Sequence, residues 1–396
     1  MTSQKPNVLL FFSDQHKAEV LGAEGHPDVV TPNLDRLAAE GVRFTNAFCQ
    51  DGICTPSRTS IMSGWYPRTL GCIHNPDRCE MLKEVVPLAE TLRRNGYRTA
   101  AFGKRHLPLG EHAACDAGWE VHSSHLPDES PGHSYHEWID AHGLMEEFKR
   151  DWRAEWGPHP ALLSARPTQI PADKTMEAYS AQRTIEFLKE QAHEDRPFFC
   201  WTSFYRPHQP YTALPEYIER FDLTHWGQGR RFGDGLALPP GLHEDIARQP
   251  PFMRKFYEPD FNDTWRLDLA QEDEQIYRNY IGAYYALVEE IDHHVGRVLD
   301  VLAEEGLDRN TIVIYTADHG DFVGAHGMAE KAAPGQNVYL DTLRVPLIVR
   351  WPQCVRRNVV SENIAELVDL YPTLLDAAGL KAPDMRFRLA GQSLLP

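Results

Sequence analysis

The sequence predicts an α/β fold in which a mostly parallel central sheet is covered by helices on both faces. Short apolar runs alternate along the chain with segments of helical periodicity, as in parallel strands that are joined by helices. Several of these runs stop abruptly at polar residues, which is typical of strands that end at a ligand site. The 396 residues are enough for one large unit around one extended sheet.

The first strand is expected over residues 6–12, because residues 8–12 are all apolar and are followed at once by Ser13 and Asp14. A short helix is expected between Thr31 and Gly41, since threonine suits a helix cap, proline suits the first turn and glycine suits the exit.

A second short helix is predicted to open at Pro56 and to close at Gly64. The remaining helices are expected over residues 88–96, 175–193 and 271–305, and the remaining strands over 97–102, 198–204, 311–316 and 345–349. Residues 1–396 are interpreted as one catalytic domain, with long insertions over the active face at 107–170 and 206–265.

The composition excludes several classes of partner. With 40 basic and 57 acidic residues the net charge is -17, which repels nucleic acid and anionic membrane surfaces. The sequence contains no run near the roughly 18 apolar residues that a membrane-spanning helix needs. A soluble, cytoplasmic protein is therefore expected, and an anionic substrate would have to be attracted by a local cluster of cations.

Cys54 differs from the other cysteines in its surroundings. The seven cysteines lack paired CxxC spacing, which argues against a disulfide framework and a structural zinc site. Cys54 directly precedes Thr55 and Pro56, so it is expected at a helix N-terminus, where backbone N–H groups favour negative charge. Arg58 lies about one turn later and can point back at the same anion. This arrangement suits a nucleophile that attacks a tetrahedral oxyanion ester.

Polar residues follow four of the predicted strands, and the carboxyl ends of parallel strands share one edge of the sheet. These polar segments are residues 13–16, 103–106, 206–208 and 317–321. Asp14, Gln15, Asp318 and His319 offer oxygen and nitrogen ligands for one divalent cation. Carboxylates favour calcium or magnesium, whereas the histidine also admits manganese or zinc. Asp321 and His326 are interpreted as turn residues or as supports for the ligands.

The run Cys54-Thr55-Pro56-Ser57-Arg58 resembles the sulfatase signature Cys-x-Pro-Ser-Arg. Further phrases resemble the same family in the same order, at residues 32–37, 41–48, 103–106, 207–208, 318–320, 326–327, 331 and 344–347. The chain is therefore identified as resembling the formylglycine-dependent (type I) sulfatases of the alkaline-phosphatase-like superfamily. In such enzymes a maturation enzyme oxidises the cysteine to formylglycine.

The resemblance implies a sulfuric ester hydrolase in which a formylglycine gem-diol, made from Cys54 and bound to a divalent metal, attacks the sulfur of a sulfate monoester. The residues it implies for catalysis are Cys54, Arg58, Lys104, His106, His208 and Lys331. Those it implies for the metal are Asp14, Gln15, Cys54, Asp318 and His319. Those it implies for substrate binding are Lys104, His208, Lys331 and Asn75, the last of which has a role in a turn as its alternative.

Gln15 and His319 depart from the commonest sulfatase pattern, which has aspartate and asparagine there. By resemblance, such pairs occur in choline sulfatases and also in phosphonate monoester and phosphodiester hydrolases of the superfamily, so hydrolysis of a phosphonate monoester or phosphodiester is the alternative activity. A silent binding protein would have no chemical need for the implied residues. Calcium is the expected metal, and a sulfated small molecule or sugar is the expected substrate. The small C-terminal subdomain of the family is expected to be missing or truncated, and the oligomeric state is left open.

Overall fold

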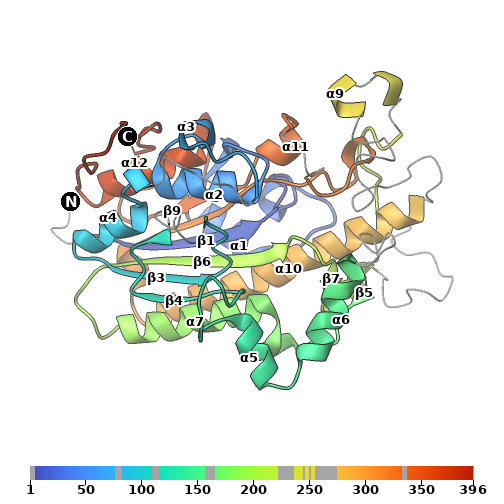
Figure 1. Cartoon of the computed structure of the whole chain (residues 1–396), viewed down its shortest axis with the longest axis horizontal. Coiled ribbons are helices and arrows are strands. Elements are labelled where there is room, and N and C mark those ends of the chain that lie inside the picture. The colour runs from blue at the N-terminus through green and yellow to red at the C-terminus, as the bar shows by residue number, and fades with distance from the viewer. Residues whose placement is uncertain are drawn as a thin grey trace.

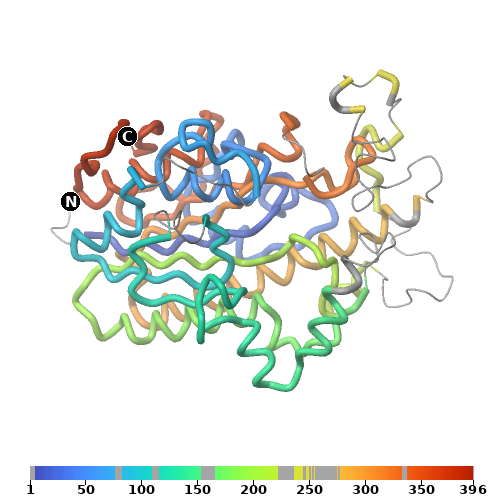
Figure 2. The backbone as a smooth tube through the Cα atoms, in the orientation of Figure 1, coloured from blue at the N-terminus to red at the C-terminus, as the bar shows by residue number. Residues whose placement is uncertain are grey.

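The fold is seen in a computed structural model that describes residues 5–75, 83–108, 116–156, 166–221, 236–243, 246–248, 251–254, 274–331 and 337–395. These residues form an eight-stranded sheet between two layers of helices (Figure 1). The backbone trace shows early and late parts of the chain side by side in this sheet (Figure 2). The predicted α/β architecture is confirmed.

The sheet is mostly parallel. Its strands, in order across the sheet, are β10 (Val359–Glu366), β2 (Val42–Phe48), β9 (Leu347–Arg350), β8 (Thr311–Ala317), β1 (Asn7–Asp14), β6 (Phe198–Pro207), β3 (Arg98–Gly103) and β4 (Val121–Ser123). Only β9 runs antiparallel to its two neighbours, β2 and β8. The central strand β1 pairs in parallel with both β6 and β8, so the ends of these three strands meet at one edge.

Helices cover both faces of the sheet (Figure 1). One face packs against α1 (Pro32–Ala39), α7 (Met176–Gln191) and α10 (Glu274–Glu304). The other packs against α2 (Cys54–Ser63), α4 (Leu88–Arg94) and α12 (Leu370–Ala377). The remaining elements that matter below are α5 (Tyr135–Ala141), α6 (Met145–Trp156) and the pair β5 (Arg166–Pro167) and β7 (Thr212–Ala213).

Strand β1 has an apolar sequence because both of its faces are buried. Val8, Leu10 and Phe12 point into the core under α2, α4 and α12, whereas Leu9 and Phe11 point into the core under α7 and α10. A strand that is buried on both faces has no polar side, so it reads as an unbroken apolar run rather than as an alternation.

The predicted elements are present, with some bounds in error. α2 begins at Cys54 and not at Pro56, because a proline is tolerated anywhere in the first turn, where its missing N–H would have no partner. β1 continues to Asp14 and β6 to Pro207, past the predicted ends at residues 12 and 204. β2, β4, β10 and α12 were not predicted.

The two predicted insertions lie partly outside the described residues, as do residues 271–273 of the long predicted helix. The described parts of the first insertion form β4, α5, α6 and β5, and those of the second include β7. Their function over the active face stays a prediction. Within the described ranges, no helix is long and apolar enough to cross a membrane.

A buried carboxylate on α10 holds the start of α1. Asp292, which is 2% exposed, accepts hydrogen bonds from the backbone N–H of Leu34 at 2.8 Å and of Asn33 at 3.1 Å. The amide of Asn33 donates to the same carboxylate at 2.8 Å. These N–H groups belong to the first turn of α1 and have no acceptor within that helix, so Asp292 supplies the cap from another element.

Replacing this carboxylate should therefore destabilise the fold. We expect Asp292→Ala to lower the free energy of unfolding by about 1–2 kcal/mol, because it leaves buried N–H groups without acceptors. The matched control is Asp300→Ala on the same helix, where a 60% exposed side chain pairs with Arg36 and the loss should be about 0.5 kcal/mol or less. Urea unfolding followed by circular dichroism measures both. Equal losses in the two variants would contradict the capping role.

Candidate active site

The candidate site lies where the carboxyl ends of four strands face the N-terminus of α2. Asp14 ends β1, Lys104 follows β3, His208 follows β6, and Asp318 follows β8. All four side chains are buried. The polar residues that the sequence placed at separate strand ends are thus brought to one edge of the sheet.

Cys54 occupies the first position of α2, after Ile53 in extended conformation. It is 1% exposed, and its Sγ lies 3.2 Å from Nε2 of His319 and 3.7 Å from Oδ1 of Asp14. The side chain of Asn75 accepts a hydrogen bond from the N–H of Thr55 at 2.9 Å, so it caps the helix that begins with the cysteine. This helix cap is neither the substrate contact nor the role in a turn that the sequence offered for Asn75.

Arg58 is wholly buried on the next turn of α2, and its guanidinium is fully engaged. Nε donates to Asp318 at 2.7 Å, and one terminal nitrogen lies 3.2 Å from Asp14. The other terminal nitrogen donates to the carbonyl of Lys104 at 2.6 Å and to Ser203 Oγ at 3.0 Å. Arg58 therefore clamps the two carboxylates instead of pointing freely at an incoming anion.

One cluster of the described residues has donor atoms suited to a cation. Asp14, Cys54, Asp318 and His319 each offer a ligand atom, these atoms lie within 4.8 Å of one another, and all four residues are buried. Two carboxylates and an imidazole fit a divalent ion by their chemistry. The residues present thus fit the metal that the sequence predicts.

Gln15, the fifth predicted ligand, is held by a network of its own. Its Nε2 donates to Asp321 at 2.7 Å, and the other oxygen of Asp321 accepts from the hydroxyl of Tyr280 at 2.6 Å. This fixes the amide so that its oxygen accepts from Lys331 Nζ at 2.8 Å. Asp321 was interpreted as a turn or supporting residue, and its contact identifies the group that it supports.

Two lysines and a histidine lie close to this cluster. Lys331 Nζ is 3.3 Å from Nε2 of His208, and the ammonium of Lys104 contacts Asp14 and lies 4.7 Å from the ring of Tyr205. Burial and the positive charges of the two lysines hold the pKa of His208 well below its usual range. The His208 imidazole is therefore neutral in this arrangement.

His106 lies two residues beyond Lys104 and is half-buried. Its backbone is in the left-handed region, at φ 48°, and its N–H donates to Oε1 of Glu129 at 2.8 Å. Within the described part of the chain its Nδ1 is buried without a hydrogen-bond partner. Glu129 fixes this loop and was not predicted, because nothing in its local sequence separates it from a solvated acidic residue.

The charges of the cluster lower the pKa values of Asp14 and Cys54 and raise that of His319. Burial opposes the ionisation of Asp14, but Lys104 and the other neighbouring cations hold the pKa of Asp14 well below its usual range. Burial and Asp14 oppose the thiolate of Cys54, but the cations again prevail and lower the Cys54 pKa well below the ordinary thiol value. Burial favours neutral His319, yet Asp318 and the cysteine raise the pKa of His319 to about 9. The cluster is thus an ionic one.

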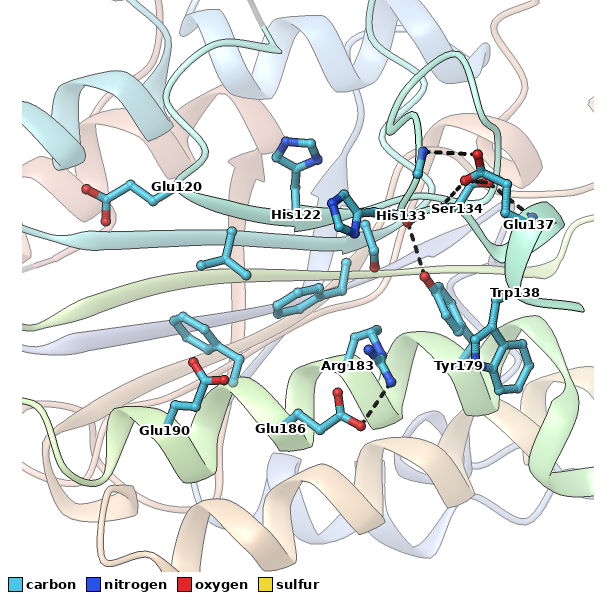
Figure 3. Close-up of a pocket in the computed structure, with 15 residues that line it drawn as sticks. Glu120, His122, His133, Ser134, Glu137, Trp138, Tyr179, Arg183, Glu186 and Glu190 are labelled. Carbon is cyan, nitrogen blue, oxygen red and sulfur yellow. Dashed lines mark hydrogen bonds and ion pairs between the residues drawn. The ribbon is translucent and has the colours of Figure 1, made fainter. Parts of the chain in front are cut away.

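A separate cavity of about 530 Å³ lies between β4, α5 and α7 (Figure 3). Its charged groups are largely paired within the wall: Arg183 contacts Glu186 at 3.0 Å, and Glu137 forms the capping box of α5 with Ser134. The residues that line it include none of those predicted for the reaction. This cavity is therefore distinct from the cluster around Cys54.

The chain resembles known proteins in sequence and in structure. Residues 6–380 match the family model described as Sulfatase. The chain is 28% identical to the sulfatase YidJ of Escherichia coli (strain K12), covering 99% of this chain and 71% of that protein. It is 25% identical to an N-acetylglucosamine-6-O-sulfatase of Bacteroides thetaiotaomicron, covering 100% of this chain and 71% of the relative. The structure of a phosphonate monoester hydrolase of Agrobacterium radiobacter superposes with a TM-score of 0.78 at 25% identity, covering 98% of this chain and 76% of that one.

If the cluster binds a divalent ion, the ion should stabilise the folded protein, because it binds the assembled ligands and not the unfolded chain. A ligand at 100 times its Kd contributes about 2.7 kcal/mol, so the Tm should rise when calcium is added after chelation. Separate titrations with magnesium, manganese and zinc rank the metals.

The variant His319→Ala removes one ligand and should lose most of this rise in Tm. The matched control is His193→Ala, at an exposed position after α7, which should keep the full rise. An undiminished metal-dependent rise in His319→Ala would show that the ion binds elsewhere.

Proposed function

Because the chain belongs to the sulfatase family and is a sulfuric ester hydrolase, we propose that it hydrolyses a sulfate monoester with a formylglycine made from Cys54. The observation that carries the proposal is the position of Cys54. It opens a helix inside the signature of the family, among two carboxylates, an imidazole and two lysines. An ordinary buried cysteine has no need of this ionic setting.

Enzymes of the sulfatase family use a metal ion and a formylglycine, and we propose that this protein uses both. As an aldehyde hydrate, formylglycine offers one hydroxyl for attack on sulfur and a second from which a proton is removed to release sulfate. A bound divalent ion, for which we propose calcium, would lower the pKa of the attacking group and neutralise developing charge. Asp14, Asp318 and His319 would hold it, whereas the amide oxygen of Gln15, the further predicted ligand, accepts a hydrogen bond from Lys331 in this structure.

The positions of the other site residues indicate the catalytic role of each. Lys104 and Lys331 supply positive charge beside residue 54, where the ester oxygens and the transition-state charge would lie. Lys331 is proposed to donate a proton to the leaving-group oxygen, and the neutral imidazole of His208, 3.3 Å away, is proposed to assist by directing this ammonium. His106 has a buried and unpartnered Nδ1 among the described residues, which suits it to accept the proton that releases sulfate.

Arg58 acts indirectly in this proposal. Its guanidinium makes four hydrogen bonds, to Asp14, Asp318, Ser203 and the carbonyl of Lys104, so it holds two ligand carboxylates at fixed positions. The side chain of Asn75 caps α2 at Thr55, and so fixes the turn on which residue 54 sits. For Asn75 we therefore propose a positioning role rather than direct contact with substrate.

The burial of Cys54 bears on its maturation. All ten residues of α2 are buried in the folded chain, and the sulfur itself is 1% exposed. A maturation enzyme must reach the side chain to oxidise it, so we propose that the conversion takes place before α2 packs on the sheet.

For the substrate we propose a sulfated sugar or a similarly small sulfate ester. A relative of this chain is named for the 6-O-sulfate of N-acetylglucosamine, and it aligns over the whole chain. The alternative, a phosphonate monoester or phosphodiester, is favoured by the likeness to the phosphonate monoester hydrolase structure. Cytoplasmic placement stays a prediction.

The role of residue 54 can be tested by substitution and by mass. We expect Cys54→Ala to abolish turnover while the circular dichroism spectrum is retained, because the nucleophile is lost and the fold is not. Cys49→Ala is the matched control: this cysteine is also buried, five residues earlier, and its variant should keep activity within a few fold. In active protein, the peptide that contains residue 54 should have the mass of the aldehyde. An unmodified thiol throughout fully active protein would refute the formylglycine route.

The leaving-group chemistry can be tested by parallel rates. We expect kcat/KM on aryl and sugar sulfates to exceed that on matched phosphodiesters and phosphonate monoesters, measured with one enzyme preparation at one metal concentration. A preference of several orders of magnitude for the phosphorus esters would overturn the sulfatase assignment and support the alternative.

A further inference from the structure

Arg206 lies at the end of β6, two residues before His208, and its guanidinium faces the loop that carries this histidine. It is 7% exposed. One terminal nitrogen lies 3.3 Å from the carbonyl oxygen of His208 and also donates to the carbonyl of Pro210. The other donates to the carbonyl of Thr212 at 3.2 Å and to its hydroxyl at 3.3 Å. A single planar group therefore ties together three carbonyls of the loop.

The backbone of Arg206 is anchored to a helix below the sheet, since its N–H donates to Oε1 of Glu177 at 3.1 Å. Nε of the guanidinium lies 3.9 Å from the other oxygen of that carboxylate, and neither of these two atoms has a hydrogen-bond partner among the described residues. Glu177 belongs to α7 and is 1% exposed. Asp151 of α6 and Glu290 of α10 line the same small cavity beside Arg206. Arg206 is thus the cation of a buried acidic cluster to which three helices contribute.

The ionisation of this cluster favours one pairing. Burial, followed by the charge of Glu177, raises the pKa of Glu290 to about 8. Glu290 is therefore largely protonated at neutral pH. Burial raises the pKa of Glu177 as well, whereas the positive charge of Arg206 lowers it, so the ionised form of Glu177 depends on the guanidinium beside it. A buried guanidinium with a countercharge keeps its position, because leaving either charge unpaired is costly.

The imidazole of His208 takes its orientation from the same loop. Its Nδ1 lies 2.9 Å from the carbonyl oxygen of Gln209, so Nδ1 carries the proton and donates it. This leaves the lone pair of Nε2 directed at Lys331 Nζ, 3.3 Å away. The tautomer and the direction of Nε2 therefore depend on where the loop places the carbonyl of Gln209. Arg206 holds the carbonyls on both sides of it.

We propose that Arg206 is a positioning residue that fixes the tautomer and the direction of the His208 imidazole, so that Nε2 accepts from Lys331 and directs this ammonium, which donates its proton to the oxygen of the departing leaving group. The proposal rests on the role given to His208 above. Arg206 touches neither the imidazole nor the nucleophile, and acts through the backbone of residues 208–212. Its planar fork matters, because a lysine has the charge but cannot span three carbonyls.

The test compares two aryl sulfates that differ in leaving group. For Arg206→Met we expect kcat on phenyl sulfate, a poor leaving group, to fall about 10- to 100-fold, as expected for misplacement of a catalytic group by about 1 Å. On 4-nitrophenyl sulfate, whose leaving group needs little assistance, the loss should be several-fold smaller, and KM should change little on either. Arg206→Lys should lie between wild type and Arg206→Met.

The matched control is Arg220→Met. Arg220 also pairs with a buried glutamate of α10, Glu289, at 2.6 Å, but its side chain is 41% exposed and it contacts no part of the His208 loop. It should leave the ratio of the two rates unchanged. Equal losses on both aryl sulfates in Arg206→Met would indicate a purely structural role and overturn the proposal. If Arg206→Met fails to fold, the same comparison in Arg206→Lys decides.

A double-mutant cycle with His208→Ala separates this proposal from the proposed function. If Arg206 acts through His208, Arg206→Met/His208→Ala should be no slower than His208→Ala alone, whereas additive losses would overturn the proposal. If His208→Ala itself lacks leaving-group dependence, the role of His208 fails. If His208→Ala has that dependence and Arg206→Met lacks it, only the present inference fails.

A readout without turnover is the ¹⁵N spectrum of the histidine rings. The signals absent from His208→Ala identify His208, and in wild type they should show the proton on Nδ1. In Arg206→Met they should move towards a mixture of tautomers, and in Arg220→Met they should stay in place. An unchanged His208 tautomer in Arg206→Met would contradict the positioning role.

Discussion

A guanidinium that is wholly shielded from water joins three elements of the fold at the carboxyl edge of the sheet. Arg58 of α2 pairs with Asp14 at the end of β1 and with Asp318 after β8. Burial and the charge of Asp14 raise the pKa of Asp318, and burial opposes the ionisation of Asp14 as well, so the charge of Arg58 favours the ionised form of both carboxylates. Removing one partner of such a set typically costs about 3–5 kcal/mol. The pairing therefore fixes how α2 sits on the two strands, and with it the place of Cys54.

Two residues at this edge of the sheet have an unusual backbone conformation. Gln15 and His106 adopt positive φ values of 70° and 48°, which side chains with a Cβ rarely adopt. Both are held by side chains from other elements: the N–H of Gln15 donates to Asp318, and the N–H of His106 donates to Glu129. Such conformations cost of order 1–3 kcal/mol each and persist where the surroundings determine them. Both residues lie in loops that carry candidate ligand and proton-transfer groups, and among the described residues Val323, His326, Glu330 and Asn358 also have positive φ values.

Much of this arrangement could be predicted from the sequence, because buried parallel strands leave an apolar run and end in polar residues. The runs before Asp14 and Asp318 predicted β1 and β8, and the parallel geometry then brought these ends together. β10 could not be found in the same way, since it is an edge strand with mostly exposed residues and no apolar period. Contacts such as Asp321 with Gln15, 306 positions apart, leave no local signal. What sequence reasoning missed is therefore a set of groups that orient the candidate site.

The site also explains how a chain with a net charge of -17 can take an anionic substrate. At physiological ionic strength charges are screened beyond about 8 Å, so the acidic surface acts weakly inside the site. Lys104 is partly neutralised by its contact with Asp14. Lys331 instead donates to the amide oxygen of Gln15 and lies beside the neutral imidazole of His208. A carboxylate at position 15 would pair with that ammonium, whereas the amide orients it and leaves its charge for the anion.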